Sequence, residues 1–334
     1  MNMNPETLPR LGSAAKKFLA NSRYGNTAVV FLLYMVFIII MAARFPNFGS
    51  YMNISNILVQ FAPLAIVSLA QTIVIISGGI DLSVGVTMGF TTVFIATVMR
   101  DSPFSIASTI VFVLLIGVCF GMFNGVGVAM FNIPPLIMTI SSMTIIQGIA
   151  FAFLSAPGGY VPLTLTSAVT MRFGIVSMPL IIVLAIYLVY KLVLSKTRFG
   201  LHVFAIGYNP AIARTAGIKV ERTTFFVYVV SSITAVLGGI LLTCRIASGD
   251  PIIGTPFALD SITASIIGGA SLSGGRGLAV GSIFGALIIG SLSNMMNMTG
   301  VQSFYQYVLK GLLLIITMIA YTAIEHWGSR QNAN

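Results

Sequence analysis

Ten apolar segments, each roughly 20 residues long and nearly free of charge, follow one another along the chain. About 20 apolar residues in a helix are the length that crosses the hydrocarbon core of a bilayer. The segments run approximately over 26–44, 54–76, 83–99, 104–130, 134–154, 178–194, 223–244, 257–273, 278–298 and 303–323. The expected fold is therefore an all-α polytopic membrane protein with about ten transmembrane helices.

The composition excludes a soluble globular domain. Only 7% of the residues are charged and 57% are hydrophobic, whereas about a quarter of the residues of a soluble domain are charged. Cys119 and Cys244 both lie in apolar segments, so the sequence predicts neither a disulfide framework nor a metal site.

The basic residues predict the orientation, because Lys and Arg concentrate in cytoplasmic loops. With ten spans, most of the 17 basic residues fall on one side if both termini are cytoplasmic. Residues 1–24 then form a cytoplasmic N-terminal tail, 25–325 the transmembrane domain and 326–334 a cytoplasmic C-terminal tail. The net charge of +10 follows from this topology, and its dispersal over short loops gives no basic face for nucleic acid.

An acidic turn, Ser77–Gly85, interrupts two apolar runs. A carboxylate at membrane depth costs about 3 kcal/mol on insertion scales, so it persists where it is paired, wetted or functional. The adjacent Gly78 and Gly79 weaken helix continuity. We therefore expect a broken helix here, with Asp81 either holding the turn through backbone N–H groups or facing a solute pathway.

A second string, Gly268–Ser273, partly repeats Gly78–Ser83, with isoleucines before both. Transporters often contain such repeats, and their interrupted helices meet the solute near the middle of the membrane. The similarity suggests a possible internal repeat with two broken helices.

Two rows of glycines recur at a spacing of four residues. Small residues let helices approach closely in lipid, so these rows predict tightly packed helix pairs, with a gating surface as the alternative. The rows are Gly117, Gly121 and Gly125, and then Gly277, Gly281 and Gly285.

The longest polar loop, 195–222, contains signals for one short helix. Asn209 is a good N-cap, Pro210 a good first helical residue, and Gly217 a good terminator after Ala211–Ala216. Such a helix under the membrane is suited to docking a partner. The chain has no P-loop, so any nucleotide must act through that partner.

Three blocks of residues together resemble a known family. They are GGIDLSVG at 78–85, the loop pattern TRFG at 197–200 with AIG at 205–207, Asn209-Pro210 and AGI at 216–218, and SGGRG at 273–277. Over about residues 30 to 323 the chain is similar to the ribose/xylose/arabinose-type permeases of bacterial ABC sugar importers, in the branched-chain/ribose permease superfamily.

The resemblance implies an inner-membrane permease subunit that forms a homodimer or pseudo-heterodimer. It also implies a periplasmic binding protein that delivers a sugar and a cytoplasmic ATPase with two cassettes. ATP-Mg then acts through the ATPase, and this chain needs no cofactor. The coupling loop would contact the ATPase through Gly207, Asn209, Pro210, Ala213, Arg214 and Gly217. The identity of the sugar stays open.

Polar residues on otherwise apolar spans are the candidates for the substrate pathway. Each has the alternative of a hydrogen bond to a neighbouring helix, because polar groups in lipid need partners. The candidates are Asp81, Ser83, Gln71, Thr72, Asn124, Thr139, Ser142, Thr144, Gln147, Asn294 and Asn297.

Two other classes of function remain as alternatives. A secondary transporter driven by protons or sodium uses intramembrane charged residues, and Asp81 is the strong candidate, since Asp250 and Asp260 are expected in or beside an outer loop. An intramembrane enzyme would need paired catalytic groups. His202 and His326 are isolated near the predicted cytoplasmic surface, so an enzyme is not expected.

Overall fold

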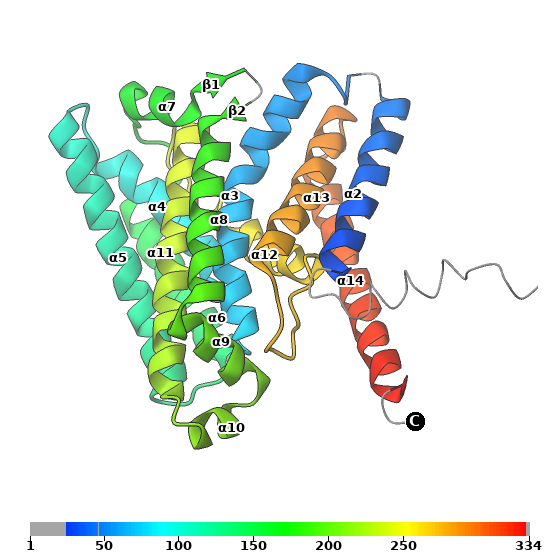
Figure 1. Cartoon of the computed structure of the whole chain (residues 1–334). Coiled ribbons are helices and arrows are strands. Elements are labelled where there is room, and N and C mark those ends of the chain that lie inside the picture. Colours follow the sequence, from blue (N-terminus) through cyan, green and yellow to red (C-terminus); the bar gives the residue numbers. More distant parts are fainter. Residues whose placement is uncertain (1–24, 46, 175, 332–334) are drawn as a thin grey trace, which may run out of the picture.

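The computed structural model describes residues 25–45, 47–174 and 176–331 (Figure 1). The predicted N-terminal tail lies outside these residues. Helices dominate the described chain, apart from a two-residue antiparallel pair, β1 (Arg172–Phe173) with β2 (Val176–Ser177). The helices are α2 (Gly25–Arg44), α3 (Tyr51–Ile76), α4 (Ser83–Val98), α5 (Pro103–Ala129), α6 (Pro135–Phe153), α7 (Leu163–Thr170), α8 (Met178–Lys196), α9 (Arg198–Tyr208), α10 (Pro210–Thr215), α11 (Val220–Ile246), α12 (Thr255–Ile267), α13 (Ala279–Met298) and α14 (Ser303–Gln331).

Six of these helices are long and apolar enough to cross a membrane: α3, α5, α6, α8, α11 and α13. Shorter apolar helical stretches cover Tyr34–Arg44, Ser83–Val98, Thr255–Ile267 and Phe304–Ile319. The expectation of an all-α polytopic membrane protein is confirmed. The count of ten spans stays a prediction, and α14 continues to Gln331, beyond the boundary expected at residue 325.

Helix α3 forms the centre of the bundle. In its most apolar stretch 89% of the residues are buried, against 22% for α5 and for α8. It packs against α8, α11, α12 and α13, and Figure 1 shows it between a group with α5 and α11 and a group with α2, α13 and α14. The outer helices turn apolar side chains such as Leu115 and Leu188 outward, as suits contact with lipid tails.

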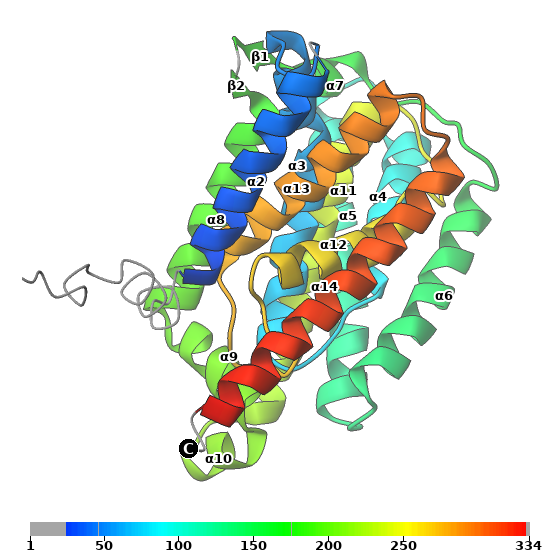
Figure 2. The same cartoon turned by 90° about the vertical axis from the view of Figure 1, so that its right-hand side faces the viewer.

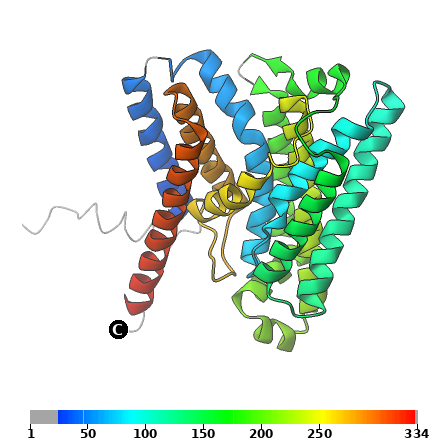
Figure 3. The ribbon, with the colours of Figure 1, turned by 180° about the vertical axis from the view of Figure 1, so that it is seen from behind.

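The two ends of the bundle differ. Helices α9 and α10 lie at one end, which we call the α10 end, and α7 with the β1–β2 pair lies at the other, the α7 end (Figures 1 and 2). Helix α14 runs toward the α10 end (Figure 2). Helix α12 crosses the bundle obliquely, and the segment after it descends toward α9 (Figures 1 and 3).

Two breaks interrupt the helices, and both begin with the same turn. After α3, the N–H groups of Gly78 and Gly79 bond to the carbonyls of Ile75 and Val74, each at 2.9 Å. After α12, Gly269 and Ala270 bond to Ile266 and Ser265, again at 2.9 Å. This is the Schellman pattern, which requires a left-handed residue, and Gly78 and Gly269 supply it with φ of 88° and 91°.

The shared turn changes the alignment of the two strings. Gly78 corresponds to Gly269, whereas the sequence comparison paired it with Gly268. The expected span 257–273 is also too long, because α12 ends at Ile267. A shared helix terminus is a local likeness, so the internal repeat stays a prediction.

The glycine rows lie at close helix contacts. A Cβ at Gly121 would lie 2.6 Å from the Val229 Cα on α11, and Gly117 and Gly125 face the same helix. On α13, Gly285 faces the backbone of Ala264 in α12, and Gly281 faces Gly268, directly after α12. Gly277 precedes α13 and contacts the Ile76 side chain.

Candidate functional site

Asp81 lies fully buried in the break between α3 and α4. Its Oδ1 accepts hydrogen bonds from the Ser83 backbone N–H at 3.0 Å and the Ser83 hydroxyl at 2.6 Å. Its Oδ2 accepts a bond from the Ser231 hydroxyl on α11 at 2.9 Å. The carboxylate therefore closes the first turn of α4 and links it to α11. Only one of its three bonds comes from a backbone N–H group, so the turn-holding role stays a prediction.

Two amides extend this network. Gln71 faces the Asp81 backbone, and with its amide nitrogen toward the carbonyl it donates to Asp81 O at 2.9 Å and accepts from Asp81 N at 3.3 Å. Asn124 on α5 donates to the Ser83 hydroxyl at 2.8 Å. The network thus joins α3, α4, α5 and α11, as buried polar groups require partners.

Tyr228 is a member of this region that sequence reasoning missed. It is 1% exposed, and a Cβ at Gly79 would lie 2.6 Å from its hydroxyl. Its hydroxyl and the Asn124 side-chain oxygen have no hydrogen-bond partner among the described residues. The only sequence signal for it was a tyrosine within an otherwise apolar span.

A cavity of about 280 Å³, the α10-end pocket, lies between this break and α10. Its lining includes Gly78, Gly79 and Tyr228 together with Pro210 and Arg214 of α10. Residues next to the Asp81 turn and residues of α10 therefore line one cavity.

Thr72 belongs to a different polar cluster. Its hydroxyl contacts Ser265 on α12 at 3.0 Å, makes a short contact with Ser282 on α13, and donates to the Ser68 carbonyl at 2.6 Å. Gln71 and Thr72 are adjacent in sequence but contact different neighbours of α3, so the candidate pathway residues do not form one set.

The candidates on α6 lie along one helix at different depths. Thr139 is buried and its hydroxyl lies 3.3 Å from the Ile80 carbonyl in the break. Ser142 is buried one turn further along. Gln147 donates to the Pro251 carbonyl at 2.9 Å, whereas Thr144 is exposed and bonds to Ile140 of its own helix.

Asn294 and Asn297 lie near the end of α13, away from the break. Asn294 is buried, and its side-chain oxygen has no partner among the described residues. Asn297 is exposed and accepts a bond from Gln306 at 2.9 Å. These two residues are therefore not brought together with Asp81.

The loop between α8 and α11 holds two helices, so the prediction of a single short helix is wrong. Helix α9 begins after Thr197, whose hydroxyl accepts a bond from Gly200 N at 3.2 Å. Helix α10 begins after Asn209, whose side chain accepts from Ala211 N at 2.9 Å, with Pro210 in its first turn. Gly217 follows α10 with φ of 81°, as the capping residues predict.

Of the residues predicted to contact the ATPase, two pack closely within the protein, and they belong to different helices. Ala213 of α10 is 3% exposed and packs with Ile206 and Val220. Gly207 of α9 lies directly against the α3 end, where a Cβ would overlap the Ile76 carbonyl oxygen and lie 2.6 Å from Gly275 N. Arg214 is exposed and forms an ion pair with Glu221.

The position of Asp260 differs from the expectation. Asp260 lies within α12 rather than in or beside a loop, and Lys310 lies within α14. The Lys310 Nζ donates to the Asp260 Oδ2 at 2.6 Å, with the side chains 21% and 13% exposed. Asp81 is therefore not the only acidic residue within the helical bundle.

Comparisons with known proteins identify the family. The chain matches the branched-chain amino acid transport system / permease component family over residues 53–318. It is 33% identical to the ribose import permease protein RbsC of Haemophilus influenzae, over 87% of this chain and 91% of that protein. It is 34% identical to RbsC of Bacillus subtilis, over 86% and 90%.

A third relative has a different named sugar. The galactose/methyl galactoside import permease protein MglC of Escherichia coli is 30% identical, over 91% of this chain and 95% of that protein. No solved structure matches the chain at a significant level. The match over most of the helical bundle, together with the buried break and the loop helices, shows that the chain belongs to the branched-chain amino acid transport system / permease component family.

Proposed function

We propose that this chain is the transmembrane subunit of an ABC importer that carries a monosaccharide or related small polar solute across the bacterial inner membrane. The named sugar permeases among its relatives support this function. In this proposal, which keeps the predicted ten-span topology, the α10 end and both termini lie in the cytoplasm. A periplasmic binding protein delivers the solute at the α7 end, and two permease subunits form the complete channel.

The observation that carries the proposal is the contact between Gly207 and the end of α3. The Ile76 carbonyl accepts a hydrogen bond from Gly275 N at 2.8 Å, and Gly207 packs against both of these groups. The loop helices therefore touch both helix breaks at one point. Closely packed backbones transmit displacement because no void is present to absorb it.

Helix α10 is the surface available to the ATPase. Ile212 is 59% exposed and Tyr208, just before α10, is 75% exposed. Exposed apolar side chains that lie together on a surface mark interaction sites. The ATPase binds here, and its movement during ATP hydrolysis displaces α9 and, through Gly207, the turn that holds Asp81.

The pathway residues have two roles in this proposal. Asp81, Ser83, Gln71 and Asn124 hold the break and give it a defined position. Solute passes on the side of the α10-end pocket, which Tyr228 helps to line. This chain acts as a permease rather than an enzyme, and ATP-Mg is bound by the partner ATPase.

Reconstitution tests the energy source. The purified chain alone should hydrolyse no ATP, and in vesicles uptake of a labelled sugar should require the cognate two-cassette ATPase and the binding protein. Vanadate should block that uptake, and a protonophore should not. Uptake by the chain alone that a protonophore abolishes would instead establish a secondary transporter.

A further inference from the structure

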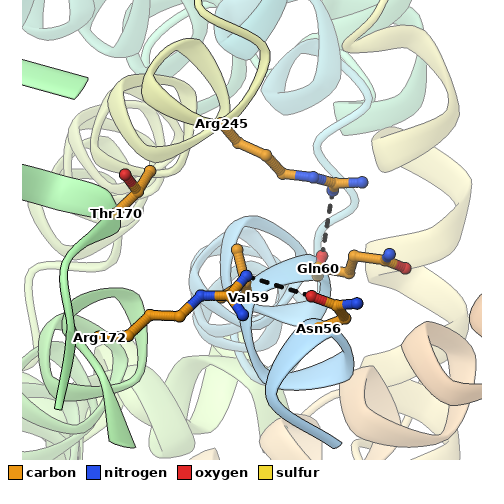
Figure 4. Close-up of a pocket in the computed structure, with 6 residues that line it drawn as sticks. All are labelled: Asn56, Val59, Gln60, Thr170, Arg172 and Arg245. Atoms are coloured by element: carbon orange, nitrogen blue, oxygen red, sulfur yellow. Dashed lines mark hydrogen bonds between the residues drawn. The ribbon is translucent and has the colours of Figure 1, made fainter. Parts of the chain in front are cut away.

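A second cavity, the α7-end pocket, lies at the opposite end of the bundle from α10 and has a volume of about 320 Å³ (Figure 4). This volume falls at the lower end of the range typical of small-ligand pockets, roughly 300–1,000 Å³. Three elements far apart in sequence form it, namely α3, the end of α7 with β1, and the last turn of α11. Its lining consists of Asn56, Val59, Gln60, Thr170, Arg172 and Arg245.

Two arginines dominate the charge of this pocket. Arg172 comes from β1 and Arg245 from α11, and both guanidinium groups extend toward α3 (Figure 4). No carboxylate lines the pocket, and neither arginine forms an ion pair with any described residue. Two cations that share one small cavity repel each other, and a bound anion relieves that repulsion.

The guanidinium groups also retain unused donors. Arg172 donates to the Asn56 Oδ1 at 3.1 Å and approaches the Met52 sulfur at 4.0 Å. Arg245 makes one long bond, at 3.4 Å, to the Gln60 carbonyl. Because each guanidinium has five N–H donors in a planar fork that matches a carboxylate, most of this capacity stays available.

Apart from the apolar Val59, the rest of the lining is neutral and polar. Asn56, Gln60 and Thr170 present amide and hydroxyl groups, which both donate and accept hydrogen bonds. Groups of this kind suit the hydroxyls of a sugar. The pocket thus combines a paired cationic site for one acidic group with neutral partners for several hydroxyls.

From this geometry we propose that the α7-end pocket binds a sugar acid, such as a hexuronate, with its carboxylate between Arg172 and Arg245. The inference rests on the proposed sugar-import function and narrows its solute class. The sugars named for two of the relatives, ribose and galactose, are neutral, so a sugar acid would be a solute of a different class.

Calorimetric titration of the purified chain in phosphatidylcholine nanodiscs tests the site without the ATPase or binding protein. The probes are D-glucuronate, D-glucose and acetate. We expect glucuronate to bind about tenfold or more tightly than either other probe, because it alone offers both a carboxylate and hydroxyls. Glucose binding as tight as that of glucuronate would show that the carboxylate does not contribute. Acetate binding as tight as that of glucuronate would show a non-specific anion site that does not recognise the sugar. Either result overturns the proposal.

Charge-removing variants locate the binding. Arg172→Gln and Arg245→Gln should each weaken glucuronate binding by about tenfold, whereas the matched variant Arg100→Gln, which removes an exposed arginine outside this pocket, should bind normally. Unchanged binding in both pocket variants, or equal weakening in Arg100→Gln, would overturn the assignment. Melting temperatures of all three variants establish that they are folded.

The site and the importer function can fail separately. ATP-driven uptake of glucose into vesicles, without glucuronate binding to the chain, would remove the proposed site and leave the importer. Tight glucuronate binding by a chain that supports no ATP-driven uptake would keep the site and remove the importer function.

Discussion

The backbone of Gly207 in α9 packs directly against the carbonyl oxygen of Ile76, the last residue of α3. A side chain at residue 207 would overlap that oxygen, and it would also meet Gly275 N. These are backbone atoms, so they cannot rotate away as a flexible side chain can. The contact joins the loop that we propose docks the ATPase to the helix end that precedes the Asp81 turn.

Gly207→Ala should therefore lower transport without preventing the ATPase from binding. The added methyl group displaces α9 from the end of α3, and we expect sugar uptake in vesicles to fall about tenfold or more while the ATPase still co-purifies, since α10 and its exposed face are unchanged. Gly148→Ala is the matched control, because no atom lies within 4 Å of the position of its Cβ. Normal uptake in Gly207→Ala would contradict a coupling role for this contact.

The ion pair between Asp260 and Lys310 should stabilise the contact of α12 with α14. Replacing one partner, as in Asp260→Asn, leaves the other charge in a largely buried site, and we expect a loss of about 3 to 5 kcal/mol in the free energy of unfolding. The double variant Asp260→Leu/Lys310→Met should recover most of this loss. Urea unfolding in detergent measures the free energy of unfolding of the wild type, the single variant and the double variant.

The exposed pair of Arg214 and Glu221 is the control for that comparison. Its side chains are 54% and 50% exposed, so Glu221→Gln should change the free energy of unfolding by less than about 1 kcal/mol. If the single Asp260 variant were no less stable than the Glu221 variant, the Asp260–Lys310 pair would have no role in holding α14.

Gly121 tests the packing of α5 on α11. A Cβ there would lie 2.6 Å from the Val229 Cα and 2.8 Å from the Tyr228 carbonyl oxygen, so Gly121→Ala forces two helix backbones apart. We expect destabilisation of about 1 to 3 kcal/mol, seen as a lower melting temperature in detergent. Gly148→Ala on α6 should be neutral, and equal melting temperatures for the two variants would contradict close packing at Gly121.

Local signals predicted the parts of this fold that depend on few residues. Asn209, Pro210 and Gly217 defined the limits of α10, because capping is decided within one or two turns of a helix. Gly78 and Gly79 likewise predicted the break after α3. A Schellman turn needs only a residue that accepts a positive φ at the right place.

Pairings between distant helices could not be predicted in this way. Asp81 receives a hydrogen bond from Ser231, 150 positions away, and Asp260 meets Lys310, 50 positions away. A serine or a charged residue on an apolar helix has many potential partners, and the sequence alone does not say which helices are neighbours. The end of α12 was also missed, because Ala270 and Leu272 continue the apolar character of the segment beyond Ile267.

Charge and shape at Asp81 can be separated by substitution. Asn keeps the size and one acceptor oxygen but removes the negative charge, whereas Ala removes both. Because the carboxylate accepts bonds from Ser83 and from Ser231 on a different helix, we expect both variants to be less stable. The Ala variant should lose more, since each buried donor left without a partner costs about 1 to 3 kcal/mol.

Melting temperature and uptake measured on the same preparations distinguish the structural role of Asp81 from a role in the pathway. Ser231→Ala removes only the link to α11 and should show a smaller loss than Asp81→Ala, while Asp101→Asn at the α7 end should leave stability unchanged. If Asp81 holds the break, uptake should decline in step with stability across this series. If the Asp81→Ala variant keeps the wild-type melting temperature but shows no uptake, the carboxylate acts in the solute pathway instead, because loss of a structural hydrogen-bond partner at a fully buried site must lower stability.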